Sequence, residues 1–108
     1  MILQLLKFES KISELLEYIC HLKAVPGRLE RVETANPKHF IFVDYAHTPL
    51  ALKLSLMELK KLKLSGAKLI LIFGCGGERD KGKRAPMGEI ASSLADIVII
   101  TDDNPRGE

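Results

Sequence analysis

Apolar residues recur along the chain in patterns that switch between a helical spacing and short continuous runs. Between Ser10 and Pro26 the apolar positions are three and four residues apart, which predicts an amphipathic helix with Ser10 as its N-cap: Ile12, Leu15, Leu16, Ile19 and Leu22. Pro26 and Gly27 break this pattern. Residues 28–35 are a candidate short strand, and residues 36–38 form a predicted turn.

A second helix is predicted after a strand. Residues 39–46 (HFIFVDYA) are aromatic and β-branched, as is typical of a strand. Thr48 and Pro49 fit the N-cap and the first position of the following helix, and Gly66 fits its end. Leucines at a helical spacing predict the buried face of this helix: Leu52, Leu56 and Leu59.

Two further apolar runs predict buried strands. Residues 68–73 (KLILIF) form a continuous run, which predicts a strand covered on both faces, and residues 97–101 (IVIIT) predict another. Pro86 precedes a short helix predicted at about residues 87–95. The alternation of strands and helices predicts a three-layer α/β domain with a mostly parallel sheet.

Each of the three main predicted strands ends in a polar segment. The segments are DYAHTP, GCGGERDKGKR and DDNPR. Because ligands of open α/β sheets bind outside the carboxyl ends of the strands, we expect all three segments at one edge of the sheet. That shared location predicts a single binding site.

The segment GERDKGKR, residues 77–84, approaches the phosphate-binding P-loop pattern G-x-x-x-x-G-K-[ST]. Arg84 stands where the pattern needs a Ser or Thr to ligate magnesium. The interior of the segment is also unusually charged for a loop that wraps a polyanion. We therefore interpret it as an anion-binding loop and not as a P-loop, with a solvated surface loop as the alternative.

The other two segments carry candidate ligand-binding groups. Asp44 is suited to the hydroxyls of a ribose and His47 to a phosphate or a base, although Asp44 could equally cap local backbone and His47 be structural. Asp103 and Asn104 accept from an ammonium group, while Arg106 pairs with a carboxylate, which suits a zwitterionic amino acid. Taken alone, however, this last segment fits an Asx-Pro turn better than a binding site.

Composition narrows the class of protein. The 108 residues suffice for one small domain, and the net charge of +2 does not indicate wholesale nucleic-acid binding. Two cysteines fit a reducing compartment, and neither a membrane span nor a signal peptide is recognisable, so we expect a cytoplasmic protein. Cys75 is interpreted as a packing residue. His21 and His39 have no metal-ligand spacing to Cys20, so no metal site is predicted in this chain.

Four segments, in this order, resemble the Mur ligases: VPGRLERV, VDYAHTP, FGCGGERDKGKR and TDDNPR. The resemblance runs from about residue 12 to the end of the chain and is closest to the branch that adds meso-diaminopimelate. It implies that residues 1–24 are the terminal helix of a central ATPase domain. Residues 25–108 would be the first part of a Rossmann-like C-terminal domain, incomplete in this chain, with VPGR as the hinge.

The resemblance also implies the chemistry of the intact protein. It implies an ATP-dependent ligase of peptidoglycan synthesis that joins meso-diaminopimelate to UDP-N-acetylmuramoyl-L-alanyl-D-glutamate through an acyl phosphate. The implied ATP contacts come from Arg28, Asp44 and His47. The implied amino-acid contacts come from Arg79, Asn104 and Arg106, with Asp103 close by. The ATP phosphates and Mg²⁺ would be held mainly by further domains of the same polypeptide, so we expect the chain alone to be inactive.

The sequence is also compatible with two other functions. One is another Mur-type or folate-type ligase with a different amine substrate, and the other is a non-catalytic nucleotide- or anion-binding module. In either case a partial sheet would expose an unpaired edge and apolar surface, from which we expect self-association.

Overall fold

The computed structural model describes residues 12–22, 25–36 and 38–108. The predicted N-cap Ser10 lies outside these residues. The elements in chain order are α2 (Ile12–Cys20), β1 (Glu30–Val32), β2 (Ile41–Val43), α3 (Pro49–Leu62), β3 (Ile70–Phe73), a 3₁₀ helix (Lys81–Lys83), α4 (Arg84–Leu94) and β4 (Ile97–Ile100). This order confirms the predicted α/β class.

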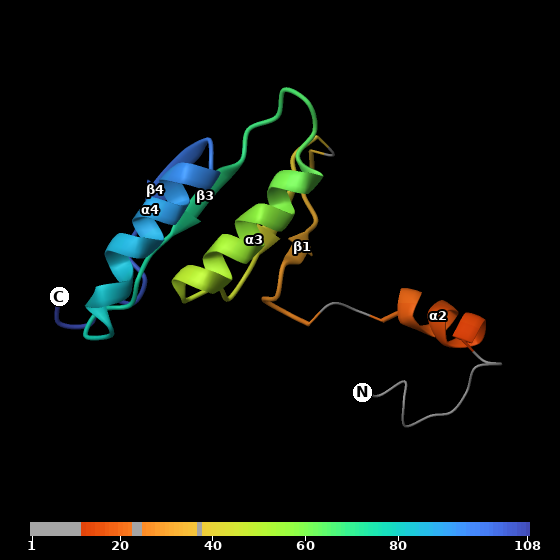
Figure 1. Cartoon of the computed structure of the whole chain (residues 1–108), viewed down its shortest axis with the longest axis horizontal. Coiled ribbons are helices and arrows are strands. Elements are labelled where there is room, and N and C mark those ends of the chain that lie inside the picture. The colour runs from red at the N-terminus through yellow and green to blue at the C-terminus, as the bar shows by residue number, and fades with distance from the viewer. Residues whose placement is uncertain (1–11, 23–24, 37) are drawn as a thin grey trace.

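Helix α2 forms where the helical spacing of apolar residues predicts it. It lies apart from the other elements (Figure 1). Most of its apolar side chains are therefore exposed, with Leu16 at 55% and Ile19 at 57%, while Leu15 is half-buried. Leu22, the last member of the predicted stripe, lies beyond the helix, which ends at Cys20.

Helix α3 begins as its sequence predicts. Thr48 has extended backbone angles, and its hydroxyl oxygen accepts a hydrogen bond from the Ala51 N–H at 3.2 Å. Pro49 takes the first helical position, where a missing N–H costs nothing. The helix ends at Leu62, earlier than predicted, and Gly66 lies in the turn beyond it with φ +77°.

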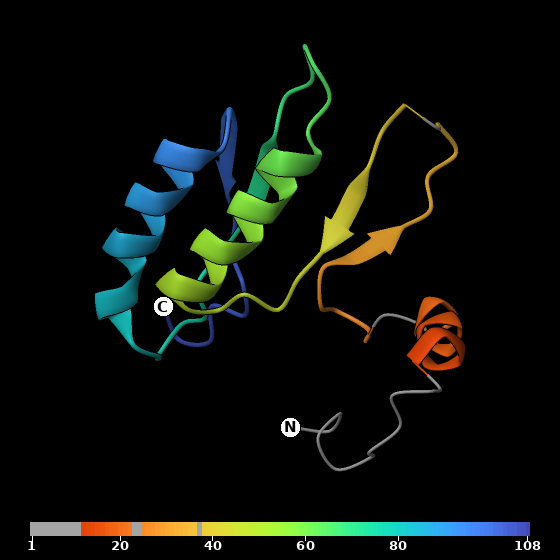
Figure 2. The same ribbon diagram turned by 45° about the vertical axis from the view of Figure 1, so that its right-hand side comes forward.

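The core lies between α3, α4 and one face of the sheet β3–β4 (Figure 2). Leu52 and Leu56 of α3 pack against Met87 of α4, which is 1% exposed. Leu71 and Phe73 of β3 cover this cluster from the sheet side. Helix α4 begins at Arg84, so Pro86 lies inside its first turn and does not precede it as predicted.

The strands form two separate two-stranded sheets. Strand β1 pairs antiparallel with β2, and β3 pairs parallel with β4, with Ile70 opposite Ile97 and Phe73 opposite Ile100. No hydrogen-bonded ladder joins β2 to β3 in the described residues, so the parallel sheet contains fewer strands than predicted. The hairpin β1–β2 closes a short loop, whereas a pairing of β2 with β3 would have to close residues 44–69 at a higher cost in chain entropy, and the second edge of β2 has no strand partner among the described residues.

The prediction that residues 68–73 are covered on both faces is wrong for this structure. Leu71 and Phe73 face the helices, but Ile70 and Ile72 on the other face are 53% and 64% exposed. The alternation follows from the two-residue period of a strand, with α3 and α4 packing on one face only.

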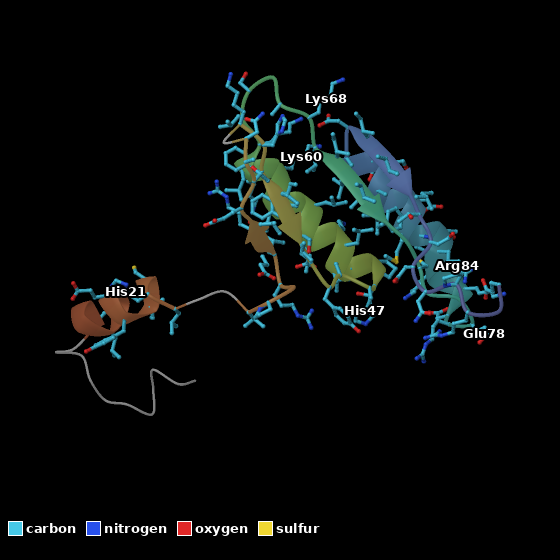
Figure 3. All side chains as sticks on the ribbon, turned by 180° about the vertical axis from the view of Figure 1, so that it is seen from behind. His21, His47, Lys60, Lys68, Glu78 and Arg84 are labelled. Carbon is cyan, nitrogen blue, oxygen red and sulfur yellow. The ribbon has the colours of Figure 1, made fainter. Side chains whose placement is uncertain are left out.

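The polar segments gather at one end of the molecule. His47, Glu78 and Arg84 lie together at this end, whereas Lys60 and Lys68 lie at the opposite end (Figure 3). Strands β2, β3 and β4 all run toward the first of these ends (Figure 2). In the part of the chain described, no helix is long and apolar enough to span a membrane.

Candidate functional site

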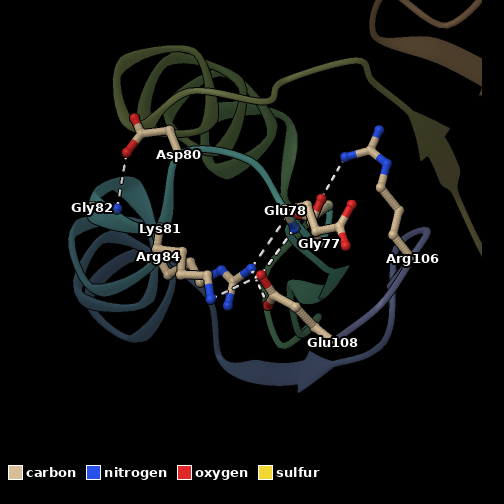
Figure 4. A network of polar contacts seen from close by, with 9 residues as sticks. Gly77, Glu78, Asp80, Lys81, Gly82, Arg84, Arg106 and Glu108 are labelled. Atoms are coloured by element: carbon tan, nitrogen blue, oxygen red, sulfur yellow. Dashed lines mark hydrogen bonds and ion pairs between the residues drawn. The ribbon is translucent and has the colours of Figure 1, made fainter.

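The loop after β3 and the segment after β4 are joined through their backbones. The Gly77 N–H donates to the Asn104 carbonyl at 3.1 Å. The Arg106 guanidinium donates to the Gly77 carbonyl (Figure 4). Glycine is needed at residue 77 because a Cβ there would lie 1.9 Å from the Pro105 carbonyl oxygen. The predicted amino-acid residues Asn104 and Arg106 therefore lie against the charged loop.

The segment after β2 reaches the same loop through one contact. The Lys83 ammonium donates to the His47 carbonyl at 2.9 Å, across an interval of 36 residues. All three polar segments that follow the strands are thus brought together, as their positions in the sequence predict. The contact is made by the backbone of His47, which leaves its imidazole outside the link.

Tyr45 connects two of the residues expected to contact ATP. The Arg28 guanidinium lies 5.0 Å from the centre of the Tyr45 ring, and the His47 ring lies 4.9 Å from it. The His47 Nδ1 is also 3.1 Å from the Tyr45 carbonyl, so the tautomer with a proton on Nδ1 can donate to it. Tyr45 was not singled out from the sequence, although its 62% exposure leaves the ring available for stacking.

Asp44 anchors the turn that carries Arg28. One carboxylate oxygen accepts from the Leu29 N–H at 2.7 Å, and the other accepts from the Ser55 hydroxyl at 3.2 Å. Leu29 has φ +46°, a left-handed conformation that a branched side chain rarely adopts, and the bond to Asp44 helps to hold it. Asp44 therefore does cap local backbone, as one of the two interpretations of the sequence proposed.

Three backbone N–H groups of the charged loop donate to protein acceptors. Gly77 donates to Asn104, Glu78 donates to the Glu108 carboxylate at 2.9 Å, and Gly82 donates to the Asp80 carboxylate at 2.9 Å. In a P-loop such groups surround the phosphates. The engaged N–H groups agree with the interpretation that the near-match to a P-loop is coincidental.

A network centred on Glu108 was missed at the sequence level. Its carboxylate contacts Lys81 at 3.0 Å and Arg84 at 2.7 Å (Figure 4). The Glu78 backbone N–H, then Arg84, then Lys81 lower the pKa of Glu108 to about 2. One signal was present in the sequence: Glu108 is an acidic residue two positions after Arg106, and the loop at residues 77–84 has a positive net charge.

The remaining predicted residues are placed as follows. Arg79 is exposed, and its guanidinium has no hydrogen bond or ion pair with any of the described residues. Asp103 lies against Gly74, where an added Cβ would be 2.9 Å from the Asp103 Cβ. A cavity of about 310 Å³ at this end of the sheet β3–β4 is lined by Arg84, Asp103 and Glu108 among others.

Cys75 packs against the core, with its sulfur 3.8 Å from that of Met87. This placement confirms its interpretation as a packing residue. Within residues 12–22, 25–36 and 38–108, no group of three His, Cys, Asp or Glu side chains is arranged to hold a metal ion.

Comparison with known proteins supports the resemblance to the Mur ligases. A family model described as "Mur ligase, glutamate ligase domain" matches residues 27–108. UDP-N-acetylmuramoyl-L-alanyl-D-glutamate--2,6-diaminopimelate ligase of Rickettsia prowazekii is 57% identical over 98 residues, covering 91% of this chain and 20% of the relative. The ligase of that name from Chlorobium phaeobacteroides is 54% identical over 87 residues, covering 81% of this chain and 17% of the relative.

Solved structures agree with these relatives. A structure of a UDP-N-acetylmuramoyl-L-alanyl-D-glutamate--2,6-diaminopimelate ligase is similar with a TM-score of 0.67 and 42% identity, over 87% of this chain and 18% of that one. The chain therefore spans about a fifth of the length of the curated relatives it matches.

Proposed function

The chain belongs to the Mur ligase family, and on that premise we propose that the intact protein is an ATP-dependent ligase. It joins meso-diaminopimelate to UDP-N-acetylmuramoyl-L-alanyl-D-glutamate, and the present residues supply a nucleotide wall and an amino-acid pocket. The observation that carries the proposal is the meeting of three polar segments at one end of the molecule. Arg106 and Asn104 contact Gly77, and Lys83 contacts His47.

The reaction proceeds in two steps that conserve atoms and charge. The D-glutamate side-chain carboxylate attacks the γ-phosphorus of ATP, which forms an acyl phosphate and releases ADP. The diaminopimelate amine then attacks the acyl carbon, loses a proton and expels phosphate, which leaves an amide. The contribution of the present residues is to position the nucleotide and the amine, because orientation of reactants is a large part of such catalysis.

The nucleotide side of the site is formed by Arg28, Asp44 and His47. Asp44 accepts one bond at each carboxylate oxygen from the protein, and a carboxylate has about four lone-pair positions. The remaining positions suit the two hydroxyls of the ATP ribose. Arg28 stacks on the Tyr45 ring, which leaves its guanidinium N–H groups available to the nucleotide. The His47 ring lies beside the same Tyr45 ring.

The amino-acid side is formed by Arg79, Asn104 and Arg106, with Asp103 close by. Arg106 gives one donor to the Gly77 carbonyl and has others for a ligand, since a guanidinium carries five N–H groups. The distal end of diaminopimelate carries a carboxylate that a guanidinium pairs with, whereas lysine offers only an ammonium group there. This difference in charge is the basis of the proposed amine specificity.

Steady-state kinetics of the intact ligase with Arg106→Ala test the proposal. We expect the KM for meso-diaminopimelate to rise about 10- to 100-fold, as for the loss of a charge-assisted hydrogen bond, with little change in the KM for ATP. Arg31→Ala is the matched control, because Arg31 stacks on Phe40 of the hairpin at 4.7 Å, outside the site. No turnover of meso-diaminopimelate by the wild type would refute the function. Undiminished turnover by Arg106→Ala would refute only the pocket.

A further inference from the structure

Glu108 binds the charged loop at three separate points. Its Oε1 accepts from the Glu78 backbone N–H at 2.9 Å and contacts the Lys81 ammonium at 3.0 Å. Its Oε2 accepts from the Arg84 guanidinium at 2.7 Å (Figure 4). The Glu108 side chain is 26% exposed, and its carboxylate links the segment after β4 to the loop after β3 at the protein surface.

The Glu108 carboxylate neutralises part of the positive charge of the loop. The loop has four basic side chains: Arg79, Lys81, Lys83 and Arg84. Lys81 and Arg84 pair with Glu108, and Lys83 donates to the His47 carbonyl. Arg79 alone of the four has no contact of this kind with a described residue, and it is exposed. The loop therefore offers one unpaired guanidinium, which matches one carboxylate better than it matches a polyphosphate.

Glu108 also fixes the distance between the two segments of the amino-acid side. It lies two residues beyond Arg106, whose guanidinium donates to the Gly77 carbonyl. The contacts of Glu108 and Arg106 thus join the segment after β4 to the loop on both sides of the Gly77–Glu78 peptide. Without the Glu108 contacts, the hydrogen bonds that join the loop to this segment among the described residues would be those from Arg106 to Gly77 and from Gly77 to Asn104.

We propose that Glu108 is a positioning residue for the amino-acid pocket, acting as the internal counter-anion of the loop that carries Arg79. It holds Arg79 and Arg106 at a fixed spacing, and it keeps Lys81 and Arg84 from binding an external anion. The proposal rests on the function proposed above, because that function supplies the ligand that Arg79 and Arg106 receive.

Two variants of the intact ligase test this role. Glu108→Gln removes the charge and keeps the shape, while Glu108→Ala removes all three contacts. We expect the KM for meso-diaminopimelate to rise at least about tenfold in both variants, because a small misplacement of a binding group is costly. The KM for ATP and the kcat at saturating amino acid should stay within about twofold of the wild type, since Glu108 touches neither the nucleotide side nor the reacting atoms.

The matched control is Glu58→Gln, which removes an exposed ion pair with Lys61 on α3. It should change neither KM. Hydrogen exchange of the Glu78 amide adds a readout that needs no substrate, and it should become faster in Glu108→Ala than in the wild type because its acceptor is lost.

The possible results separate a positioning role of Glu108 from a merely structural one. A uniform fall in kcat with no selective rise in the amino-acid KM would overturn the positioning role and leave only a structural one. Unchanged exchange at Glu78 would overturn the contact itself. If the wild type uses an amine other than meso-diaminopimelate, the proposed function fails, and the same KM comparison with that amine still tests Glu108. If Glu108→Ala does not fold, Glu108→Gln supplies the kinetic comparison.

Discussion

Substitution of Gly77 by alanine tests whether the loop after β3 and the segment after β4 form one unit. A Cβ at residue 77 would lie 1.9 Å from the Pro105 carbonyl oxygen, and real Cβ atoms essentially never come closer than 3.0 Å to such a neighbour. The two backbones must therefore separate by at least about 1.1 Å. A shift of that size would break the 3.1 Å hydrogen bond from Gly77 to Asn104.

The cost follows from the rigidity of the obstacle. The atom that blocks the Cβ is backbone and not the end of a flexible side chain, so Gly77→Ala should destabilise the chain by about 1–3 kcal/mol. In the intact ligase, the same displacement moves Arg106 away from Arg79, and we expect the KM for meso-diaminopimelate to rise by up to about 100-fold. Urea unfolding of the chain and steady-state kinetics of the ligase measure the two effects.

Gly88→Ala is the control for this experiment. Gly88 lies inside α4, where an added Cβ would meet nothing within 4 Å. The substitution should stabilise the chain by up to about 1 kcal/mol, because alanine is the better helix former. If Gly77→Ala proves as stable as the wild type and leaves the amino-acid KM unchanged, the close approach of Gly77 to Pro105 is absent and the reasoning is refuted.

Two further predictions concern the sheet β3–β4. Hydrogen bonds from the Leu69 backbone N–H and then from Lys63 lower the pKa of Asp96 below its ordinary value. The ionised carboxylate therefore stabilises the fold above about pH 3.8, and this stabilisation is lost as the pH falls through the lowered pKa. In urea titrations, Asp96→Asn should thus destabilise the chain at neutral pH and lose less stability than the wild type on acidification; parallel pH profiles would contradict this. The exposed isoleucines, with Ile72 at 64%, predict self-association of the chain, which Ile72→Lys should weaken and Ser92→Lys on α4 should not. A clean monomer of the wild type at high concentration in size-exclusion chromatography would count against it.

Local features of the fold were predictable because short-range chemistry decides them. The start of α3 follows from Thr48 and Pro49, whose roles depend on neighbouring residues only. The placement of the three polar segments at one end also followed, since it needs only the direction of the strands. The strand with which β2 pairs could not be predicted from the sequence. Periodicity identifies a strand but carries no information about which strand it pairs with, and here β2 pairs with β1 and not with β3.

The Glu108 network escaped prediction for a related reason. The sequence of residues 77–84 predicts a loop whose basic side chains bind a ligand. In the structure, Lys81 and Arg84 instead form ion pairs with Glu108. A contact between residues 84 and 108 depends on the parallel register of β3 and β4, which brings the residues after Phe73 and Ile100 together. That register was not available from the pattern of apolar residues alone.

The two interpretations of Asp44 considered for the sequence are compatible with each other. Its carboxylate holds the Leu29 N–H and the Ser55 hydroxyl, which leaves lone pairs for the hydroxyls that we propose it binds. The same bond to Leu29 connects the proposed ribose acceptor to the turn at Gly27 and Arg28, which is the hinge that the family resemblance implies. Tyr45 strengthens this connection, since its N–H donates to the Gly27 carbonyl at 2.8 Å. We therefore propose that a rotation at this implied hinge would move Arg28 and Asp44 together, which would couple nucleotide binding to the orientation of the domain.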